Sequence, residues 1–579
     1  YNDWLDLGWT LFNVGQGSDE ALKLWIAFSK KSDKFIDGKC EDEWGNMELR
    51  NKTLGSLLAM AKRDNPKMYD EWRNTNIRYH LFRSLIEPVP NEYDVSVVIA
   101  KRYEGIFLCT GKDNWVEFRD HRWHEMDDAI SLRKLFATEI VNLYQELKMD
   151  FVKQQNPGED DMEYRKLKEK QQRCEKIIEK LKTVKFHNNL MKMCKLNMSD
   201  PTFLKKADQD KMLFACENGV LDLNLGIFRE GRPDDYITMT SGIVFPTSTP
   251  DRSDIAFINR YFKQLYPNPN IRNFAMDTFA QCIEGGNVNK QFVIFTNDGD
   301  GGKSELIILL ERMMGEYLGK FPREMFVTKA IGGSGPKEEL TRTHGKRIMT
   351  VDEIASNEEI NVGVVKLLTG KDSFYARGMY AIKGNDLKPQ FTLFLQCNIL
   401  PKIPGNDQAT WNRVRVVNHE SRFTKQAPAE EAEQWRTNHF PADLDVISRV
   451  QNLADVVLWM MFERYKEFKN RKPIIPKEVT RATDEYRADN DIYKMFIQEY
   501  VEITEDKRHS VTTNEFIDKF VTWYKEEFSS YAKDKFGKLT LRKAFKPYLG
   551  LPKGKPLTWY GVRFTDEEDD VPKAEGMIR

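Results

Sequence analysis

The segment TNDGDGGKSE, residues 296–305, combines acids, glycines, a lysine and a serine in a spacing that permits two kinds of chemistry. Its acidic first half is typical of the start of a calcium-binding loop, whereas Gly-Gly-Lys-Ser ends a phosphate-binding loop. An EF-type calcium loop starting at Asp298 needs an oxygen ligand at its fifth position, glycine at its sixth and glutamate at its twelfth. The chain has Gly302, Lys303 and Leu309 there, so the calcium interpretation fails.

The surrounding sequence favours a phosphate-binding loop, or P-loop. Residues 292–295 form an apolar run typical of a buried parallel strand, and apolar residues at helical spacing follow the loop. Glycines allow backbone N–H groups to turn toward phosphate oxygens, and the next helix N-terminus adds partial positive charge. Lys303 would then contact the β- and γ-phosphates of ATP, and Ser304 would bind Mg²⁺. The predicted nucleotide-binding residues are Asn297, Asp298, Gly299, Asp300, Gly301, Gly302, Lys303 and Ser304.

One position departs from the P-loop consensus, which begins with glycine where this chain has Asn297. Asparagine is the least costly replacement for glycine in a left-handed backbone conformation. Gly299 and Gly301 add flexibility nearby. We therefore expect the departure to change only the first turn of the loop.

A P-loop NTPase also needs an acid that holds Mg²⁺ and a base that orients the attacking water. Residues 348–351 form an apolar run that predicts a strand, and Asp352 and Glu353 follow it directly. We assign Asp352, with Ser304, to magnesium and Glu353 to the water. Two solvated acids after a strand are the alternative interpretation.

Two further polar residues follow apolar runs. Asn398 comes after FTLFLQC and can hydrogen-bond the γ-phosphate or the water, although a turn-forming asparagine before a proline is the alternative. Arg413 and Arg415 lie on a later apolar stretch and face one side if it is a strand. An arginine at a subunit edge can stabilise the transition state in a neighbouring site as an arginine finger. We expect Arg413 to have this role, and the pattern leaves Arg415 open.

The bulk composition excludes few functions. Lys+Arg is 88 and Asp+Glu is 89, so the net charge of -1 gives no argument for nucleic acid and any basic surface must be local. The seven cysteines form no C-x-x-C pair, which predicts reduced thiols and neither a zinc knuckle nor a disulfide framework. No apolar run approaches the about 20 residues of a membrane span, and no signal peptide is visible. The chain begins at Tyr1 and not at Met, as we expect of a fragment.

Hydrophobic patterning divides the chain into a multidomain α/β protein. Residues 1–78 are predicted helical, and short strands are expected from residue 91 (YDVSVVIA, GIFLCT, WVEFRDHRW). Residues 130–196 are predicted to form a solvated helical hairpin. An α/β core spans 255–425, a helical connector 430–485, and residues 490–579 contain two amphipathic helices before a terminal hairpin, LTWYGVRF.

Together the motifs resemble the superfamily 3 helicases. The order NDGDGGKS, TVDE, VKLLTGKDSFYARGMY, FLQCN and Trp-x-Arg is similar to the primase–helicases of nucleocytoplasmic large DNA viruses, the poxvirus and African swine fever virus type. ENGVLDLNLGIFREGRPDDYIT resembles the domain that precedes the helicase core in this viral family. The first 75 or so residues are similar to the small domain that follows an archaeo-eukaryotic primase.

The resemblance implies an AAA+-like P-loop NTPase core at 255–425, flanked by mostly helical N-terminal domains and a winged-helix-like C-terminal domain at 490–579. It assigns 1–78 to a primase C-terminal-like domain and 91–250 to an α+β domain that precedes the helicase, with the primase module missing from this chain. It also implies a β-hairpin that points into the pore of a hexamer. The hairpin tip would carry Lys383, with Lys388 nearby, as DNA-binding residues that contact backbone phosphates without reading bases. A solvated hairpin lysine is the alternative.

The expected activity is that of an ATP-dependent, ring-shaped DNA helicase for viral genome replication. Lys303, Glu353 and Asn398 of one subunit and Arg413 of the next would form each catalytic site, with ATP and Mg²⁺ as cofactors. The expected partners are further copies in a hexamer, single-stranded or forked DNA and viral replication proteins such as a DNA polymerase, with no membrane. The expected location is the host cytoplasm at viral replication sites, with the nucleus as an alternative.

Two rival functions stay open at this point. One is a P-loop NTPase that acts as a non-unwinding DNA motor or origin-binding switch, and the other is a non-enzymatic scaffold. The C-terminal region is locally basic, which suits either DNA contact or a structural lid. Its basic residues are Lys538, Arg542, Lys543, Lys546, Lys553 and Lys555.

Overall fold

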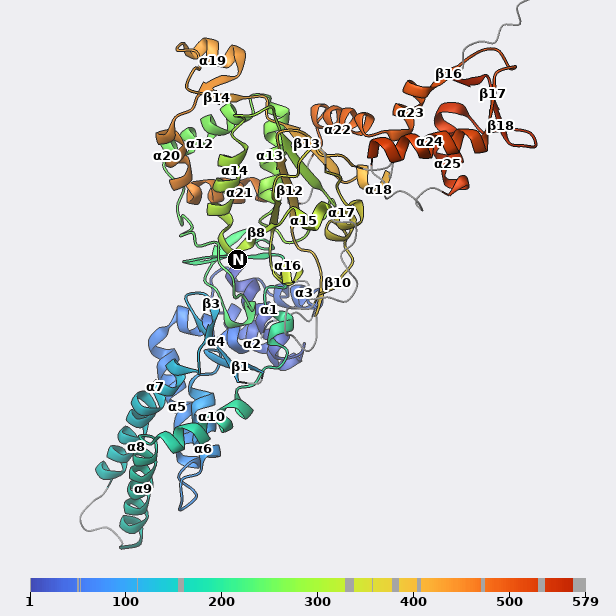
Figure 1. Cartoon of the computed structure of the whole chain (residues 1–579). Coiled ribbons are helices and arrows are strands. Elements are labelled where there is room, and N and C mark those ends of the chain that lie inside the picture. The colour runs from blue at the N-terminus through green and yellow to red at the C-terminus, as the bar shows by residue number, and fades with distance from the viewer. Residues whose placement is uncertain are drawn as a thin grey trace, which may run out of the picture.

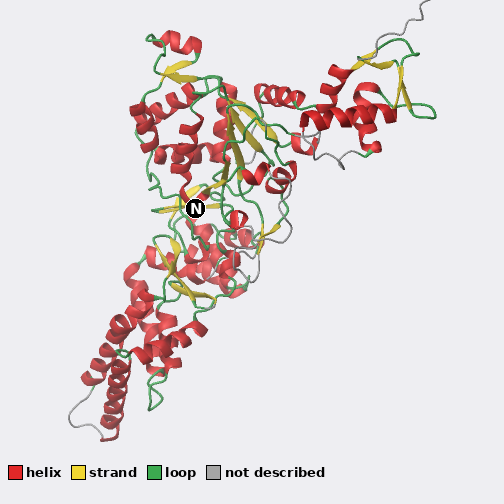
Figure 2. Ribbon diagram, viewed as in Figure 1, coloured by secondary structure: helices red, strands yellow, loops and turns green. Residues whose placement is uncertain are grey.

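The computed structural model describes residues 2–48, 52, 54–111, 113–154, 161–327, 338–356, 358–376, 385–403, 408–469, 474–528 and 537–565. These residues form a mixed α/β structure with helical N-terminal regions, a central parallel sheet and a small C-terminal region (Figure 1, Figure 2). Within them no helix has the length and apolarity needed to cross a bilayer. The cysteines are buried and form no disulfide.

The first helices pack around tryptophan. Trp25 is fully buried and stacks on Trp4, with ring centroids 4.6 Å apart. Gly8 is needed at this contact, because a Cβ there would lie 2.3 Å from the Trp25 ring. The helices of this region are α1 (Asn2–Val14), α2 (Asp19–Ser29), α3 (Lys39–Gly45), α4 (Leu54–Asp64) and α5 (Pro66–Arg83).

The next region combines helices with an antiparallel sheet, β1-β2-β3. Its elements are α6 (Glu92–Arg102), β1 (Phe107–Gly111), β2 (Asn114–Arg119), β3 (Arg122–Met126), α7 (Ile130–Leu135), the π-helical η1 (Phe136–Ile140), α8 (Val141–Lys153), α9 (Asp161–Lys180), α10 (Val184–Asn197) and α11 (Phe203–Lys206). The strand prediction for YDVSVVIA is wrong, because this run lies in α6. The Asn91 side chain caps α6 by accepting from the N–H of Asp94, and Val95, Val98 and Ile99 are buried at helical spacing.

The predicted hairpin within 130–196 is present as α8 and α9, but it is not simply solvated. Its inner face contributes Tyr144, Phe151 and Ile177 to a hydrophobic core that also contains residues of α6. Its outer face carries the charged residues that dominate the composition. The segment is therefore an amphipathic part of the fold, in which α8 and α9 lie side by side (Figure 1).

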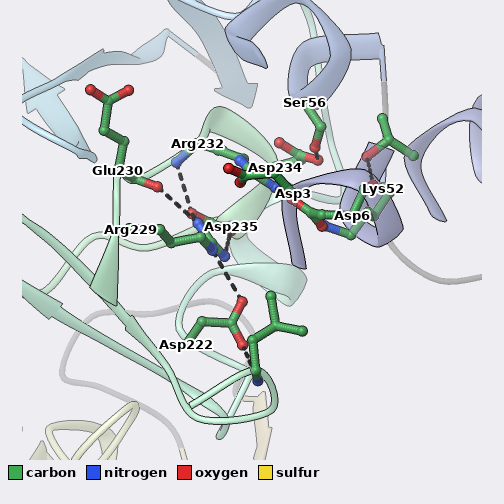
Figure 3. Close-up of polar contacts among 12 residues, drawn as sticks. Asp3, Asp6, Lys52, Ser56, Asp222, Arg229, Glu230, Arg232, Asp234 and Asp235 are labelled. Atoms are coloured by element: carbon green, nitrogen blue, oxygen red, sulfur yellow. Dashed lines mark hydrogen bonds and ion pairs between the residues drawn. The ribbon is translucent and has the colours of Figure 1, made fainter. Parts of the chain in front are cut away.

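A buried ion cluster joins the first helices to a three-stranded sheet of β4 (Leu213–Cys216), β5 (Gly219–Asp222) and β6 (Ile227–Arg229), and to η2 (Pro233–Asp235) (Figure 3). Arg229 bonds Asp222 at 3.0 Å and Asp235 at 2.8 Å. Asp6 of α1 forms ion pairs with Arg232, which directly precedes η2, and with Lys52, both at 2.5 Å. Because breaking a buried ion pair leaves an uncompensated charge, this cluster fixes α1 against η2.

The central region is built on a parallel sheet with the order β13-β7-β12-β9-β8. Its strands are β7 (Phe292–Thr296), β8 (Leu318–Phe321), β9 (Ile348–Val351), β12 (Thr392–Cys397) and β13 (Val414–Asn418). This sheet confirms the α/β prediction. Since the strands are parallel, the carboxyl ends of β7, β9 and β12 lie at the same end of the sheet, which brings the glycine-rich loop after β7, the Asp-Glu pair and Asn398 together.

Helices cover both faces of this sheet. Val293 and Phe295 of β7 belong to the core on one face, and Phe292 and Ile294 to the core on the other, as the alternation of a strand requires. The other elements of the region are α12 (Arg252–Leu265), α13 (Pro269–Gln281), α14 (Lys303–Met314), η3 (Gly315–Tyr317), α15 (Glu324–Val327), α16 (Glu338–Thr341), α17 (Val362–Leu368), β10 (Phe374–Ala376), β11 (Asn385–Leu387), α18 (Gln408–Trp411), β14 (Arg422–Thr424), α19 (Glu431–Thr437), β15 (His439–Pro441), α20 (Leu444–Asn452), α21 (Ala454–Phe468) and α22 (Lys477–Asp489).

The C-terminal region has its own hydrophobic core and extends beyond α22 (Figure 1). Its elements are α23 (Ile492–Tyr500), β16 (Val501–Ile503), β17 (Ser510–Thr512), α24 (Thr513–Phe528), α25 (Lys538–Leu549), β18 (Thr558–Tyr560) and β19 (Val562–Phe564). The predicted hairpin at 557–564 is wrong. β18 pairs with β17 and β19 with β16, so Gly561 joins two strands that belong to different sheets.

Candidate nucleotide-binding site

The loop between β7 and α14 has the backbone conformation that its glycines permit. Gly299 and Gly302 have φ of 115° and 74°, and Asp300 has φ of 54°. Asn297 does not adopt a positive φ, so the reason given from the sequence for tolerating asparagine there is wrong. Gly302 is the N-cap of α14, which places Lys303 and Ser304 in the first turn of that helix.

Lys303 is the centre of a hydrogen-bonded set at the carboxyl edge of the sheet. Its buried ammonium donates to Asn297 Oδ1 at 2.9 Å and to Asn398 Oδ1 at 3.0 Å. The Glu353 Oε1 accepts from the N–H of Asn398 at 3.2 Å. Burial lowers the pKa of the Lys303 ammonium, and the nearby Glu353 carboxylate opposes this effect. The structure thus brings together residues from three separate strand ends.

Asn297 ties the loop to the segment that follows β13. Its Oδ1 accepts from the N–H of Gly299 at 2.7 Å, and its Nδ2 donates to the carbonyls of His419 and Ser421 at 3.3 and 3.4 Å. A Cβ on Gly301 would lie 2.5 Å from the Asn297 amide, so glycine is required opposite it. The asparagine is therefore an integral part of the loop.

His419 contacts the glycine-rich loop between β7 and α14 and was not predicted from the sequence. It is buried, its Nδ1 donates to the Gly301 carbonyl at 2.8 Å, and its Nε2 accepts from the Tyr266 hydroxyl at 3.0 Å. These two contacts require the neutral Nδ1–H tautomer. Burial lowers the pKa of His419 to about 4. The only sequence signal was a histidine directly after an apolar strand, and its contacts lie 118 and 153 positions away.

His419 is expected to make the protein sensitive to mild acid. Its folded pKa lies below the unfolded value of about 6.5, so the unfolded state binds the proton first as pH falls. The stabilisation is complete above about pH 6.5 and is lost toward about pH 4. Between about pH 7.5 and pH 5 the loss amounts to about 2 kcal/mol. His419→Gln keeps a donor and an acceptor without the titration, so its thermal unfolding should lose less between the two pH values. Equal losses in both proteins would contradict this assignment.

The residues assigned to magnesium lie nearby but are not joined to each other. The Asp352 carboxylate pairs with Lys320 Nζ at 2.6 Å, and Ser304 is exposed in the first turn of α14. Carboxylate and hydroxyl oxygens are suitable ligands for Mg²⁺. Asp352 already binds one cationic group, the Lys320 ammonium. In the described part of the chain no group of three or more His, Cys, Asp or Glu residues could hold a metal alone. A magnesium ion here would depend on nucleotide phosphates as further ligands.

Arg413 and Arg415 lie near the amino-terminal ends of the parallel strands, whereas the glycine-rich loop follows the carboxyl end of β7. β13 starts at Val414, which pairs with Phe292 at the start of β7, whereas the loop follows the end of β7. At about 3.3 Å per residue, the two ends of β7 are about 13 Å apart. Arg413 donates to the Ala409 carbonyl, and Arg415 donates to the Val414 and Asn412 carbonyls. Within the described residues, neither guanidinium forms an ion pair.

The expected pore hairpin is described only at its base. β10 and β11 pair antiparallel, with Phe374 opposite Leu387, and Lys388 is exposed directly after β11. Lys383 and the rest of 377–384 lie outside the described residues. Asp298 and Asp300 of the P-loop are exposed.

Comparisons with known proteins place these residues in a family. Residues 96–280 match the family model D5 N terminal like, and residues 1–61 match Primase C terminal 2 (PriCT-2). A protein of Acanthamoeba polyphaga mimivirus described as a candidate helicase (L207/L206) is 30% identical over 91% of this chain and 55% of its own length. A similar protein of Invertebrate iridescent virus 6 (184R) is 30% identical over 94% of this chain and 63% of its own, and one of Frog virus 3 (022R) is 26% identical over 90% and 62%.

The chain spans between about half and two thirds of the length of these relatives. The matches to both family models lie in the order expected from the motifs, ahead of the P-loop region. Together these matches support a D5-type primase–helicase family for this chain.

Proposed function

We propose that this chain is the motor part of an ATP-dependent DNA helicase that works as a ring, expected to be a hexamer, in viral genome replication. The observation that carries the proposal is the hydrogen-bonded set of Lys303, Asn398 and Glu353 at the carboxyl edge of the parallel sheet. If the five strands are numbered in chain order, they lie in the sheet as 5-1-4-3-2, with the P-loop after strand 1 and the two acids after strand 3. The viral relatives described as helicases support the same activity.

The chain's own groups can bind and orient a nucleotide. The N–H groups of Gly301 and Gly302 and the N-terminus of α14 would face phosphate oxygens, which would replace the amide oxygens now bound to Lys303. Bound magnesium, held by Asp352 and Ser304, would neutralise phosphate charge. Glu353, fixed by the Asn398 N–H, would orient the attacking water. Catalysis of this kind is positioning and charge stabilisation.

The partners and surroundings follow from the proposed activity. ATP and Mg²⁺ are the proposed substrate and cofactor, and single-stranded or forked DNA would pass through the ring. A primase module upstream, a viral DNA polymerase as partner and replication sites in the host cytoplasm belong to the same proposal. The similarity to PriCT-2 and the greater length of the relatives support the upstream primase module.

Lys383→Ala is expected to abolish strand separation of a forked DNA and to leave basal ATP hydrolysis largely intact, because a lysine at the hairpin tip would hold one backbone phosphate far from the nucleotide. Unwinding is measured with a fluorescent fork in ATP and Mg²⁺, and hydrolysis by phosphate release. Lys425→Ala, at an exposed lysine beyond β14, is the control and should change neither.

The same assay separates the rival functions. Unchanged unwinding by the Lys383 variant would remove the hairpin from the mechanism. Wild-type protein that hydrolyses ATP without opening the fork would be a non-unwinding motor or switch. Protein without any hydrolysis would be a nucleic-acid scaffold.

A further inference from the structure

The C-terminal region separates its charges to an unusual degree. Between residues 537 and 565 the sequence has seven basic residues and no acidic one, in a chain whose net charge is -1. Residues 492–528 of the same region have eight acidic and five basic residues. Among the described residues of this region, the net positive charge therefore lies on α25 and the segment that follows it.

The fold places three of these charges on one side of α25 and exposes three of the others. On α25, Leu541 and Phe545 are buried in the region's core. Lys538, Arg542 and Lys546 recur every four residues, so they share one side of the helix. With Lys543, Lys553 and Lys555 they form what we call the basic face; its lysines are exposed and Arg542 is half-buried.

The loop that carries the last two lysines is held in place. The N–H of Lys553 donates to the Thr558 carbonyl and the N–H of Thr558 to the Lys553 carbonyl, both at 2.9 Å. These bonds close a tight turn that leaves Lys553 and Lys555 exposed. Within the described residues, Lys543, Lys546, Lys553 and Lys555 form no ion pair, so their charge is available to a partner.

We propose that the basic face binds duplex DNA through backbone phosphates, as a second DNA site outside the ring pore. The order α23, β17, α24, α25 and then a turn leading to β18 matches that of winged helices, in which one helix enters the major groove and the turn flanks it. A groove about 12 Å wide accepts a helix about 10–12 Å across. The lysines on α25 and on the turn would then contact phosphates on either side of the groove.

A duplex fits this surface better than a single strand or a protein. Single-strand sites depend on aromatic side chains on which bases stack, and Tyr560 is the exposed aromatic among described residues 537–565. A protein interface usually has an apolar centre depleted of lysine. Leu539, Leu551 and Leu557 are also exposed in this segment, but they are outnumbered by its five exposed lysines, which suit phosphate contacts.

The test uses the full chain without nucleotide and a labelled mixed-sequence duplex of about 20 bp, followed by fluorescence anisotropy between about 50 and 200 mM salt. Lys543→Gln with Lys546→Gln should lower duplex affinity about tenfold or more and reduce the slope of log K against log salt by about one per lysine. The matched control is Lys494→Gln with Lys507→Gln, at two exposed lysines of the same region outside the basic face. The control should bind as the wild type does, and circular dichroism checks that both variants fold.

Unchanged duplex affinity and slope in the Lys543/Lys546 variant would overturn the proposal, as would a loss confined to the matching single strand. An acidic run at 566–570 follows the basic segment and lies outside the described residues. The test uses the full chain, so that any competition between this run and DNA for the basic face is included. Duplex binding needs no nucleotide, and Lys303→Met should bind the duplex as tightly as wild type. Failure of ATP hydrolysis would thus leave this inference standing, and failure of duplex binding would leave the proposed helicase motor standing.

Discussion

Lys303→Met is expected to reduce ATP hydrolysis by about 10²–10³-fold and to remove most of the affinity for ATP. The Lys303 ammonium donates to Asn297 Oδ1 and Asn398 Oδ1 at 2.9 and 3.0 Å, where phosphate oxygens would bind. A charged donor to phosphate is worth more than a neutral one, and methionine offers none. Phosphate release in ATP and Mg²⁺ measures the loss, with Lys425→Met as a control at an exposed lysine.

Thermal unfolding distinguishes the loss of the ATP contact in Lys303→Met from the loss of the fold. Methionine fills a volume similar to lysine and removes the cost of burying an ammonium, so the unliganded variant should unfold at the same temperature or higher. Saturating ATP should stabilise wild type, by about 2.7 kcal/mol at 100 times Kd, and should leave the variant unchanged. A variant that keeps a third or more of the wild-type rate would show that the loop is not the nucleotide site.

The central site was largely predictable because of its pattern. The strands that end at the site are short and mostly apolar, and the polar residues come directly after them, as in 292–295, 348–351 and the run before Asn398. Once the strands are parallel, their carboxyl ends share one edge, so residues 95 positions apart meet. The sequence therefore supplied both the residue types and the reason for their proximity.

The errors came from segments whose partners are distant. YDVSVVIA is short and rich in β-branched residues, so a helix and a strand were equally compatible with it, and packing in the surrounding core decided for the helix. The strands at 557–564 look like a hairpin, but Thr558 pairs with Thr512 and Val562 with Ile503. Local sequence does not encode such partners.

The supporting contacts of the P-loop were missed for the same reason. His419 bonds Gly301 from a segment that follows the loop in the sequence, and Tyr266, which precedes the loop, bonds His419. The side-chain contacts of Asn297 with the His419 and Ser421 carbonyls likewise depend on tertiary structure. A consensus comparison registers Asn297 only as a departure, although its amide ties the loop to the segment that follows β13.

Equal amounts of inactive Lys303→Ala and inactive Arg413→Ala protein are expected to recover ATP hydrolysis when they assemble together. Within one chain Arg413 lies at the sheet edge opposite the P-loop, so it would reach a nucleotide only in a neighbouring copy. Loss of an arginine finger reduces hydrolysis by about 10³–10⁵-fold, so each variant alone should be nearly inactive.

The expected recovery has a definite size. An active interface needs an Arg413→Ala subunit on the P-loop side, which still has Lys303, and a Lys303→Ala subunit on the other side, which still has Arg413. Random mixing gives this arrangement at about one quarter of the interfaces, so about a quarter of the wild-type rate is expected if sites act independently. Mass measurement must show that both variants form rings. The same mixture with Arg415→Ala identifies the finger: an Arg413→Ala protein that is active alone, with recovery in the mixture that contains Arg415→Ala, would assign the role to Arg415. No recovery with either variant, in rings that assemble, would mean that the catalytic site is not shared between subunits.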